Sequence, residues 1–336
     1  MKKSNGSKKK RNVIIIIAVV LFILLLVLLL SGSDEEMSDT VDEEVVISEE
    51  DSSIDNEDSS DSMSDFTSRD FSSEEEFPLG TAAELEGKIV VVSIFLNDNT
   101  TSWDFDSAAD NETIQKLSRN MAMGMDWIVE QGKKYGKDIE FIYNWDDDAE
   151  LFYVIDIDCD FSTGENQIAE VKMLLDENFV EVSNKLMDRY SADNIIYAMY
   201  LNENENTNMV CHAMPFNGTE LGYDMPYEPI CLTNYVYGAE QGPATYAHEM
   251  LHLFGAPDYY DVDEMGNNYG MTPEFVEYCE NNMKNEIMYS TYDPYTNTIP
   301  KDGVTNDFTD LTAYYVGWID SADLVDEFGL GASQHH

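Results

Sequence analysis

The sequence predicts a mixed α/β domain that is preceded by a transmembrane helix and a disordered spacer. Three observations predict this architecture: one long apolar run near the N-terminus, an acidic tract without apolar clusters, and then alternating strand-like and helix-like stretches. The expected segments are a basic cytoplasmic segment (1–12), a transmembrane anchor (13–30), an acidic stalk (31–80), one globular domain (81–328) and a disordered tail (329–336).

The N-terminal segment has the features of a signal-anchor. Six of the 18 Lys and Arg residues lie within positions 1–12, directly before "VIIIIAVVLFILLLVLLL" at 13–30. At about 1.5 Å per residue, such a helix just spans a hydrocarbon core of about 30 Å, and its basic flank should stay cytoplasmic, which places the rest of the chain outside. A cleaved signal peptide, and hence a secreted protein, is the alternative. However, the run is long for a signal peptide and no A-x-A-like cleavage site follows it.

The acidic composition restricts the partners of the chain. There are 67 Asp and Glu residues, and the formal net charge is −49. Such a polyanion repels nucleic acid, so nucleic-acid binding is excluded. Residues 31–80 are rich in Ser, Asp and Glu and contain one basic residue, Arg69. Because this tract cannot bury enough apolar surface to compensate for the entropy of ordering, we expect a disordered, self-repelling stalk.

Four cysteines lie in the part of the chain that should be exported, namely Cys159, Cys211, Cys231 and Cys279. In an oxidising compartment they permit two disulfides in any of three pairings. Four reduced, buried thiols are the alternative. No C-x-x-C pair occurs, which argues against a cysteine-based zinc site.

Within the globular domain, strand patterns and helix patterns alternate. The run 88–96 is continuously apolar and β-branched, as in a buried strand. Apolar residues at helical spacing predict a helix over 109–135, and a second long helix is expected over 165–190. Further strands are expected at 138–145, 150–158, 194–201, 208–216 and 228–236. Strands that alternate with long helices favour a mixed α/β layer.

The most informative stretch is "TYAHEMLHLFGAPDYYD" at 245–261, which contains two of the five histidines of the chain. Pro243 is a suitable first helical residue, and the apolar residues that follow form one stripe for the core. His248 and His252 then lie one turn apart on a neighbouring face, where both imidazoles can bind one metal ion. Glu249 lies between them and can reach a water molecule on that ion.

A third metal ligand is expected just after this helix. Gly255 allows a left-handed turn that ends the helix, so the chain can reverse and bring Asp258 to the same ion. Two imidazoles and a carboxylate at this spacing are typical of a catalytic zinc site. The alternatives for the third ligand are Asp261, Asp263, Glu264, Glu274 and Glu277.

The stretch "HEMLHLFGAPD" resembles the H-E-x-x-H-x-x-G-x-x-[H/D] zinc signature of the metzincin metallopeptidases. It resembles the variant with Asp as third ligand, found in snapalysin-like and immune-inhibitor-A-like bacterial peptidases. "NEIMYS" at 285–290 is similar to the Met-turn of this family, which implies that Met288 forms an apolar floor beneath the zinc site. "LTAYYVGWID" at 311–320 is similar to its closing helix. The resemblance implies a metzincin-like zincin domain, with a twisted mixed sheet, backing helices, an active-site helix and a Met-turn.

One position departs from the family pattern. Several metzincins have a Tyr two residues after the Met of the turn, where it binds zinc or the oxyanion, but Ser290 occupies that position here. Tyr289 and Tyr292 lie nearby in the sequence, and Tyr292 is the candidate for this role.

These residues together predict a hydrolytic mechanism. Neutral His248 and His252 with ionised Asp258 would bind Zn²⁺ and leave one position for a water molecule, whose pKa the ion lowers toward about 7. Glu249 would accept the proton as the water attacks the carbonyl carbon, and would pass it to the departing amine. An edge strand near 208–214 would bind the substrate in an extended conformation.

Two further loops are weaker candidates for metal binding, and the remaining three histidines are not assigned to the zinc site. The loops 261–270 and 156–165 are rich in oxygen ligands and are candidates for a structural Ca²⁺, but neither matches an EF-hand and turn chemistry explains them equally well. His212 is expected outside the zinc site. His335 and His336 are expected in the disordered tail, without a role.

We therefore expect an extracellular, membrane-anchored zinc endopeptidase that acts as a monomer on polypeptide substrates. A non-catalytic cation-binding surface or adhesion protein on the same fold is one alternative, but it would require the loss of Glu249 or a histidine. A cell-wall amidase is a second alternative, although such enzymes usually bind zinc through differently spaced ligands.

Overall fold

The computed structural model describes residues 84–158, 171, 174–175, 178–206, 211–213, 228–260 and 270–336. The expected anchor at 13–30 and the expected stalk at 31–80 lie outside these residues. Within the described ranges, no helix combines the length and apolar character needed to cross a membrane.

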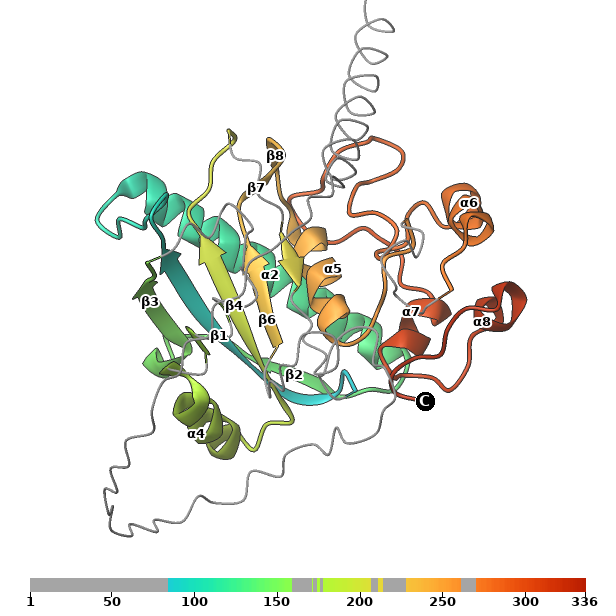
Figure 1. The fold of residues 1–336 in the computed structure, drawn as a ribbon, viewed down its shortest axis with the longest axis horizontal. Helices are drawn as coiled ribbons and strands as arrows, with labels where there is room; N and C mark the ends of the chain where they lie inside the picture. Colours follow the sequence, from blue (N-terminus) through green and yellow to red (C-terminus); the bar gives the residue numbers. More distant parts are fainter. Residues whose placement is uncertain are drawn as a thin grey trace, which may run out of the picture. The chain divides into compact units, whose positions relative to one another are not determined.

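A mixed sheet organises the domain (Figure 1), which confirms the mixed α/β prediction. The strands follow the order β2-β1-β4-β6-β5, and β3 also pairs with β1. All of these pairs are parallel except β5, which runs antiparallel to β6 at the end of the order. The strands are β1 (Gly87–Asn97), β2 (Ile139–Ile142), β3 (Phe152–Asp156), β4 (Asn194–Leu201), β5 (His212–Ala213) and β6 (Glu228–Leu232).

Strand β1 is central, because it has neighbours on both sides. Its first half pairs with β2 and its second half with β3, while β4 pairs along the opposite side. Ile89 and Val91 face one hydrophobic cluster, and Val90 and Val92 face the other. A parallel strand buried on both faces has no solvent side, which explains why its sequence is continuously apolar rather than alternating.

Helices cover both faces of the sheet (Figure 1). Apolar residues of α2 (Ala108–Lys134) and α5 (Pro243–Leu253) belong to the larger cluster, and Leu186 of α4 (Val180–Tyr190) belongs to the smaller one. The larger cluster continues into the C-terminal third of the chain. The remaining elements are η1 (Ala149–Leu151), β7 (Tyr235–Val236), β8 (Ala239–Glu240), α6 (Pro273–Asn282), α7 (Asp310–Tyr315) and α8 (Asp323–Phe328).

Helix α2 forms where helical spacing of apolar residues predicts it. The Ser107 side chain caps its first turn by accepting a hydrogen bond from the Asp110 N–H at 3.4 Å. Lys133 and Lys134 lie in the last turn, where positive charge interacts favourably with the helix dipole.

Gly124 lets α2 approach the first turns of α5 closely. A Cβ at this position would lie 3.1 Å from both the Ala247 nitrogen and the Pro243 oxygen, two backbone atoms of α5. Backbone atoms inside a buried helix cannot rotate away, so the side chain of residue 124 limits the distance between the two helices.

Two expectations differ from the structure, and a third is tested in part. In the helix expected over 165–190, α4 covers the C-terminal part, and most of the remainder lies outside the described residues. The expected strand 228–236 is divided into β6 and β7. Residues 329–336 are not a disordered tail, because Ser333 Oγ donates a hydrogen bond to the Tyr315 oxygen at 3.1 Å and His335 Nε2 lies 2.9 Å from the Phe254 oxygen.

The described cysteines decide against the two disulfides that the sequence permitted. Cys211, Cys231 and Cys279 are buried free thiols, so the arrangement with two disulfides is wrong. Cys159 lies outside the described residues. Burial raises the pKa of Cys211 and of Cys279 to about 12, so both thiols are protonated and unreactive at neutral pH.

We expect Gly124→Ala to lower the free energy of unfolding by about 1–2 kcal/mol, because the added methyl group overpacks the contact between α2 and α5. This cost should exceed the gain in helix propensity, about 1 kcal/mol. Urea denaturation measures the change. Glu130→Ala, on the exposed side of the same helix, should stay within about 0.5 kcal/mol of the wild type. A Gly124→Ala variant more stable than the wild type would contradict the close contact.

Candidate metal centre

Helix α5 carries His248, Glu249 and His252, and it is buried along its whole length. Its start is held by close contact, because a Cβ at Gly242 would lie 2.1 Å from the Pro300 oxygen. No residue other than glycine fits there without moving the backbone. The helix is therefore enclosed by the rest of the fold, which holds its side chains in fixed positions.

The chain reverses directly after α5. Gly255 has a φ of +97°, and a Cβ there would also lie 3.0 Å from the Gln334 side chain. The Gly255 N–H donates to the His252 oxygen at 3.0 Å, and the turn continues toward Asp258. Glycine is needed at this reversal, as the spacing of the sequence predicts.

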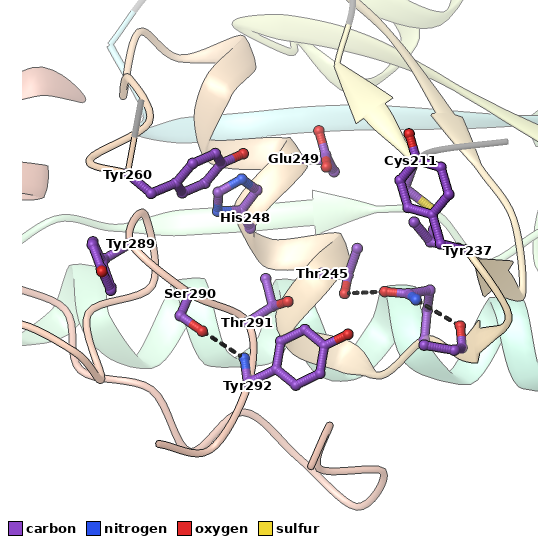
Figure 2. Close-up of a pocket in the computed structure, with 13 residues that line it drawn as sticks. Cys211, Tyr237, Thr245, His248, Glu249, Tyr260, Tyr289, Ser290, Thr291 and Tyr292 are labelled. Atoms are coloured by element: carbon purple, nitrogen blue, oxygen red, sulfur yellow. Dashed lines mark hydrogen bonds between the residues drawn. The ribbon is translucent and has the colours of Figure 1, made fainter. Parts of the chain in front are cut away.

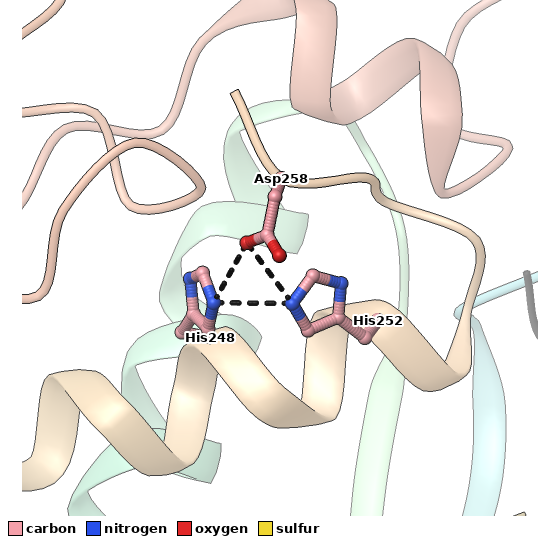
Figure 3. A group of neighbouring side chains, drawn as sticks. All are labelled: His248, His252 and Asp258. Carbon is pink, nitrogen blue, oxygen red and sulfur yellow. Dashed lines mark hydrogen bonds and ion pairs between the residues drawn. The ribbon is translucent and has the colours of Figure 1, made fainter. Parts of the chain in front are cut away.

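The reversal brings three side chains together (Figure 3). The Nε2 atoms of His248 and His252 lie 3.1 Å apart, and Asp258 Oδ1 lies 3.2 Å from the first and 3.3 Å from the second. In a tetrahedral site with bonds of about 2.0–2.1 Å, neighbouring ligand atoms are about 3.3 Å apart. The three atoms thus have the spacing of one face of a tetrahedral zinc site.

A hydrogen bond at Nδ1 of each imidazole determines its tautomer, and thereby whether Nε2 can bind a metal ion. His248 Nδ1 lies 2.9 Å from the Ile287 oxygen, and His252 Nδ1 lies 2.7 Å from the Ala256 oxygen. A carbonyl oxygen only accepts, so each Nδ1 carries the proton and each neutral ring presents a lone pair at Nε2. Asp258 Oδ1 is buried and has no hydrogen-bond partner of good geometry. Three acceptors therefore converge on one point, which is repulsive unless a cation or a proton lies among them.

The pKa values of His248 and Asp258 show that a proton relieves this repulsion. Burial lowers the pKa of His248, but the nearby Asp258 carboxylate more than compensates and raises it to about 9. Burial opposes the ionisation of Asp258, yet the two imidazoles hold its pKa well below the usual range. In the metal-free protein, a proton on His248 thus takes the place that a metal ion can occupy.

Glu249 lies beside this group and contacts the edge of the sheet. Its Oε2 accepts a hydrogen bond from the Ala213 N–H of β5 at 2.9 Å. Burial raises the pKa of Glu249, and the two imidazoles lower it in part. The carboxylate is therefore held between the candidate metal ligands and the edge strand.

A cavity of about 400 Å³ opens beside His248 and Glu249 (Figure 2). Four tyrosines line it: Tyr237, Tyr260, Tyr289 and Tyr292. The sequence singled out Tyr292, and the structure places this residue on the cavity wall, where its role as an oxyanion or metal ligand stays a prediction. Sequence reasoning missed Tyr260, whose ring lies nearly parallel to that of His248 with centroids 6.3 Å apart. Its position two residues after Asp258 was the available signal.

The segment around Met288 lies against the candidate metal ligands. Besides the Ile287 oxygen that holds His248, the Met288 oxygen accepts a hydrogen bond from the Tyr259 N–H at 3.0 Å, next to Asp258. The Met288 side chain is fully buried. Its equivalence to the metzincin Met-turn stays a prediction.

Glu286 stabilises this segment from inside the core. Its carboxylate accepts hydrogen bonds from the Met288 N–H and from the hydroxyl groups of Thr309 and Thr312, which join the segment to α7. The residue is 1% exposed. Burial raises its pKa to about 7, even though these hydrogen bonds lower it.

The other residues that the sequence offered as metal ligands lie apart from this group or outside the described residues. Among the described residues, His248, His252 and Asp258 form the group of His, Cys, Asp or Glu side chains that could hold an ion. Glu274 and Glu277 lie on the exposed side of α6, and His212 lies on β5. Outside the described residues lie Asp261, Asp263, Glu264 and most of both candidate calcium loops.

The sequence matches no protein-family model and no curated protein, so the geometry of the site carries its interpretation. That geometry defines a class of site: two imidazole nitrogens and one carboxylate oxygen converge beside a cavity and an adjacent glutamate. Two imidazole nitrogens and one carboxylate oxygen form a donor set that suits a divalent transition-metal ion, of which Zn²⁺ is one.

We expect Zn²⁺ affinity to rise about tenfold per pH unit between pH 7 and 9 and to level off above. Below its pKa of about 9, His248 of the metal-free protein carries a proton that must leave before the ring can bind a metal ion. Competition with a chelator at a series of pH values measures this dependence.

Asp258→Asn provides the control for this measurement. Without the carboxylate, the pKa of His248 should fall, so the rise in affinity should move to lower pH while the affinity itself decreases. A wild-type affinity that stays constant between pH 7 and 9 would contradict the protonated, metal-free site.

Glu286 should make stability depend on pH. Because its pKa rises from the ordinary 4.5 to about 7 on folding, the folded state binds more protons between these values, and the free energy of unfolding should decrease as pH increases. Relative to Glu286→Gln, the wild type should lose about 3 kcal/mol between pH 4.5 and 8. Denaturant unfolding at several pH values tests this. The exposed Glu277→Gln should show no such difference, and a pH-independent difference for Glu286→Gln would rule out the shift.

Proposed function

We propose that this protein is a zinc-dependent endopeptidase. The observation that carries the proposal is the convergence of His248 Nε2, His252 Nε2 and Asp258 Oδ1 at 3.1–3.3 Å, with the Glu249 carboxylate beside them and a cavity in front. Among the described residues three ligands converge. A purely structural zinc site is closed by a fourth protein ligand, whereas a catalytic site keeps one position open.

The roles of the residues follow from their positions. A zinc ion bound there would lower the pKa of a water molecule and polarise the carbonyl of the scissile bond. Glu249 receives the proton of that water and delivers it to the departing amine. Its Oε2 is held by Ala213, which leaves Oε1 as the oxygen that takes the proton. The carbonyl oxygens of Ile287 and Ala256 keep both imidazoles in the tautomer that presents Nε2 to the metal.

The edge strand supports a polypeptide as substrate. Strand β5 is the last strand of the sheet order and contacts Glu249 through Ala213. An extended peptide that added to such an edge would pass directly along the general base. The cavity beside Glu249 then provides space for a substrate side chain.

The proposal includes the placement of the enzyme outside the cell. The basic segment 1–12, the apolar run 13–30 and the acidic stalk 31–80 support a single-pass anchor with the N-terminus in the cytoplasm and the catalytic domain held away from the membrane. We propose a monomer, since every candidate catalytic residue comes from one chain.

We expect Glu249→Gln to lower kcat/KM for peptide hydrolysis by about 10²–10⁴-fold, because the amide cannot accept the proton of the attacking water. Zinc content and thermal stability should stay close to those of the wild type, since the Gln carbonyl can still accept the hydrogen bond from Ala213. Cleavage of a protein substrate by the zinc-loaded full-length chain, with metal analysis of both variants, is the measurement.

Glu274→Gln is the matched control, because it makes the same chemical change on the exposed side of α6. It should leave kcat/KM unchanged. If Glu249→Gln keeps full activity, Glu249 is not the general base. If the wild type binds zinc but cleaves no polypeptide, the non-catalytic cation-binding alternative replaces the peptidase.

A further inference from the structure

The described wall of the cavity beside the candidate metal centre is mainly aromatic. Among the described residues that line it there is no Lys or Arg, and Glu249 and His248 are the charged or basic side chains. This contrasts with a chain whose formal net charge is −49. Its volume of about 400 Å³ lies within the range of about 300–1,000 Å³ that is usual for ligand pockets.

One residue of this wall has an unfavourable backbone conformation. Tyr237 and Gly238 form the two-residue turn between β7 and β8, with φ values of +49° and +76°. Such a turn requires positive φ at both residues and strongly favours Asn-Gly. A bulky side chain in the left-handed region is strained, and Tyr237 is 69% exposed, so burial in the core does not compensate for the strain.

The turn has a set position relative to the candidate catalytic residues. Gln241 Nε2 donates to the Ala239 oxygen, and Gln241 Oε1 accepts from the Thr245 hydroxyl, both at 2.7 Å (Figure 2). Thr245 lies one turn before Glu249 on α5. The Gln241 side chain therefore connects the β7–β8 hairpin to the helix, and Tyr237 at the tip of this hairpin lines the cavity.

The tyrosines lie on different sides of the cavity. In the view of Figure 2, Tyr260 lies beside His248, whereas Tyr237 lies on the other side of the group, next to Cys211. A side chain that entered the cavity would contact aromatic rings on both sides. Among the described lining residues the carboxylate is that of Glu249, which already interacts with the Ala213 N–H and with the two imidazoles.

We propose that this cavity binds a large, uncharged side chain of the polypeptide substrate, aromatic or long aliphatic, and that Tyr237 determines this specificity. The inference rests on the proposed peptidase function. Burying a charged side chain without a partner is costly, and a small side chain would leave the aromatic wall without contacts. The strained tyrosine is retained because its ring forms part of the binding surface.

The test uses a set of peptides that differ at one position beside the scissile bond, which carries Phe, Leu, Ala, Asp or Lys. The zinc-loaded full-length wild type should cleave the Phe and Leu peptides with a kcat/KM about 10–100-fold above that of the Ala peptide, and the Asp and Lys peptides least. Tyr237→Asn should reduce the preference for Phe over Ala at least fivefold, mainly through a higher KM. Its Tm should equal or exceed that of the wild type, since Asn suits the turn.

Two control variants distinguish the contribution of the Tyr237 ring from that of its hydroxyl group and from the loss of an exposed tyrosine elsewhere. Tyr237→Phe should keep the preference, because the ring and not the hydroxyl group makes the contact. Tyr295→Ala removes a tyrosine that is 92% exposed and does not line the cavity, and it should change nothing. An unchanged preference in Tyr237→Asn would overturn the assignment of Tyr237.

A binding measurement keeps this inference separate from the proposed function. Fluorescence anisotropy of labelled peptides on zinc-loaded, full-length Glu249→Gln reports affinity without turnover. Phe and Leu peptides should bind at least tenfold more tightly than Ala or Asp peptides, and Tyr237→Asn in the same background should remove most of the difference. Equal binding of all peptides would overturn the inference, whereas this order of binding without any cleavage by the wild type would overturn the peptidase function alone.

Discussion

The candidate site depends on three acceptor atoms that repel one another unless a cation or a proton lies among them. Two imidazole lone pairs and one carboxylate oxygen meet at 3.1–3.3 Å in a buried position. Such an arrangement persists only when the surrounding backbone holds it and a cation relieves it. The protein supplies the first condition through the carbonyl groups behind each ring, and a proton or a divalent metal ion supplies the second.

Segments distant in the sequence provide that backbone. Helix α5 presents the imidazoles, and the reversal at Gly255 returns the chain to them. The Ile287 oxygen accepts the hydrogen bond from His248 Nδ1. Glu286 then joins this segment to α7 from within the core. Burial of the Glu286 carboxylate raises its pKa and therefore lowers the stability of the folded state above that pKa. The hydrogen bonds that hold the segment compensate for this in part.

The net charge of the chain acts at long range, whereas the polarity of the cavity acts on a group that is bound inside it. The acidic residues give the chain a formal net charge of −49, and their field acts over the Debye length of about 8–10 Å. Four tyrosines line the cavity, so under the proposed function selection among substrates there would depend on shape and on the cost of burying charge. A long-range attraction for basic polypeptides would then be compatible with an uncharged side chain bound beside the candidate metal centre.

The sequence by itself determined the features that local periodicity or spacing encodes. Strands β1 and β4, helix α2, and the pair His248 and His252 with Glu249 all follow from apolar patterns and from the geometry of one helical turn. Asp258 was one of several carboxylates that the sequence offered as third ligand, and among the described residues the reversal at Gly255 brings Asp258 to the two imidazoles. Tertiary structure alone decided the contact of Ala213 with Glu249, the burial of Glu286, the ordered C-terminus and the place of Tyr237 on the cavity wall. These contacts join residues that are many positions apart, and no pattern along the chain specifies which of them will meet.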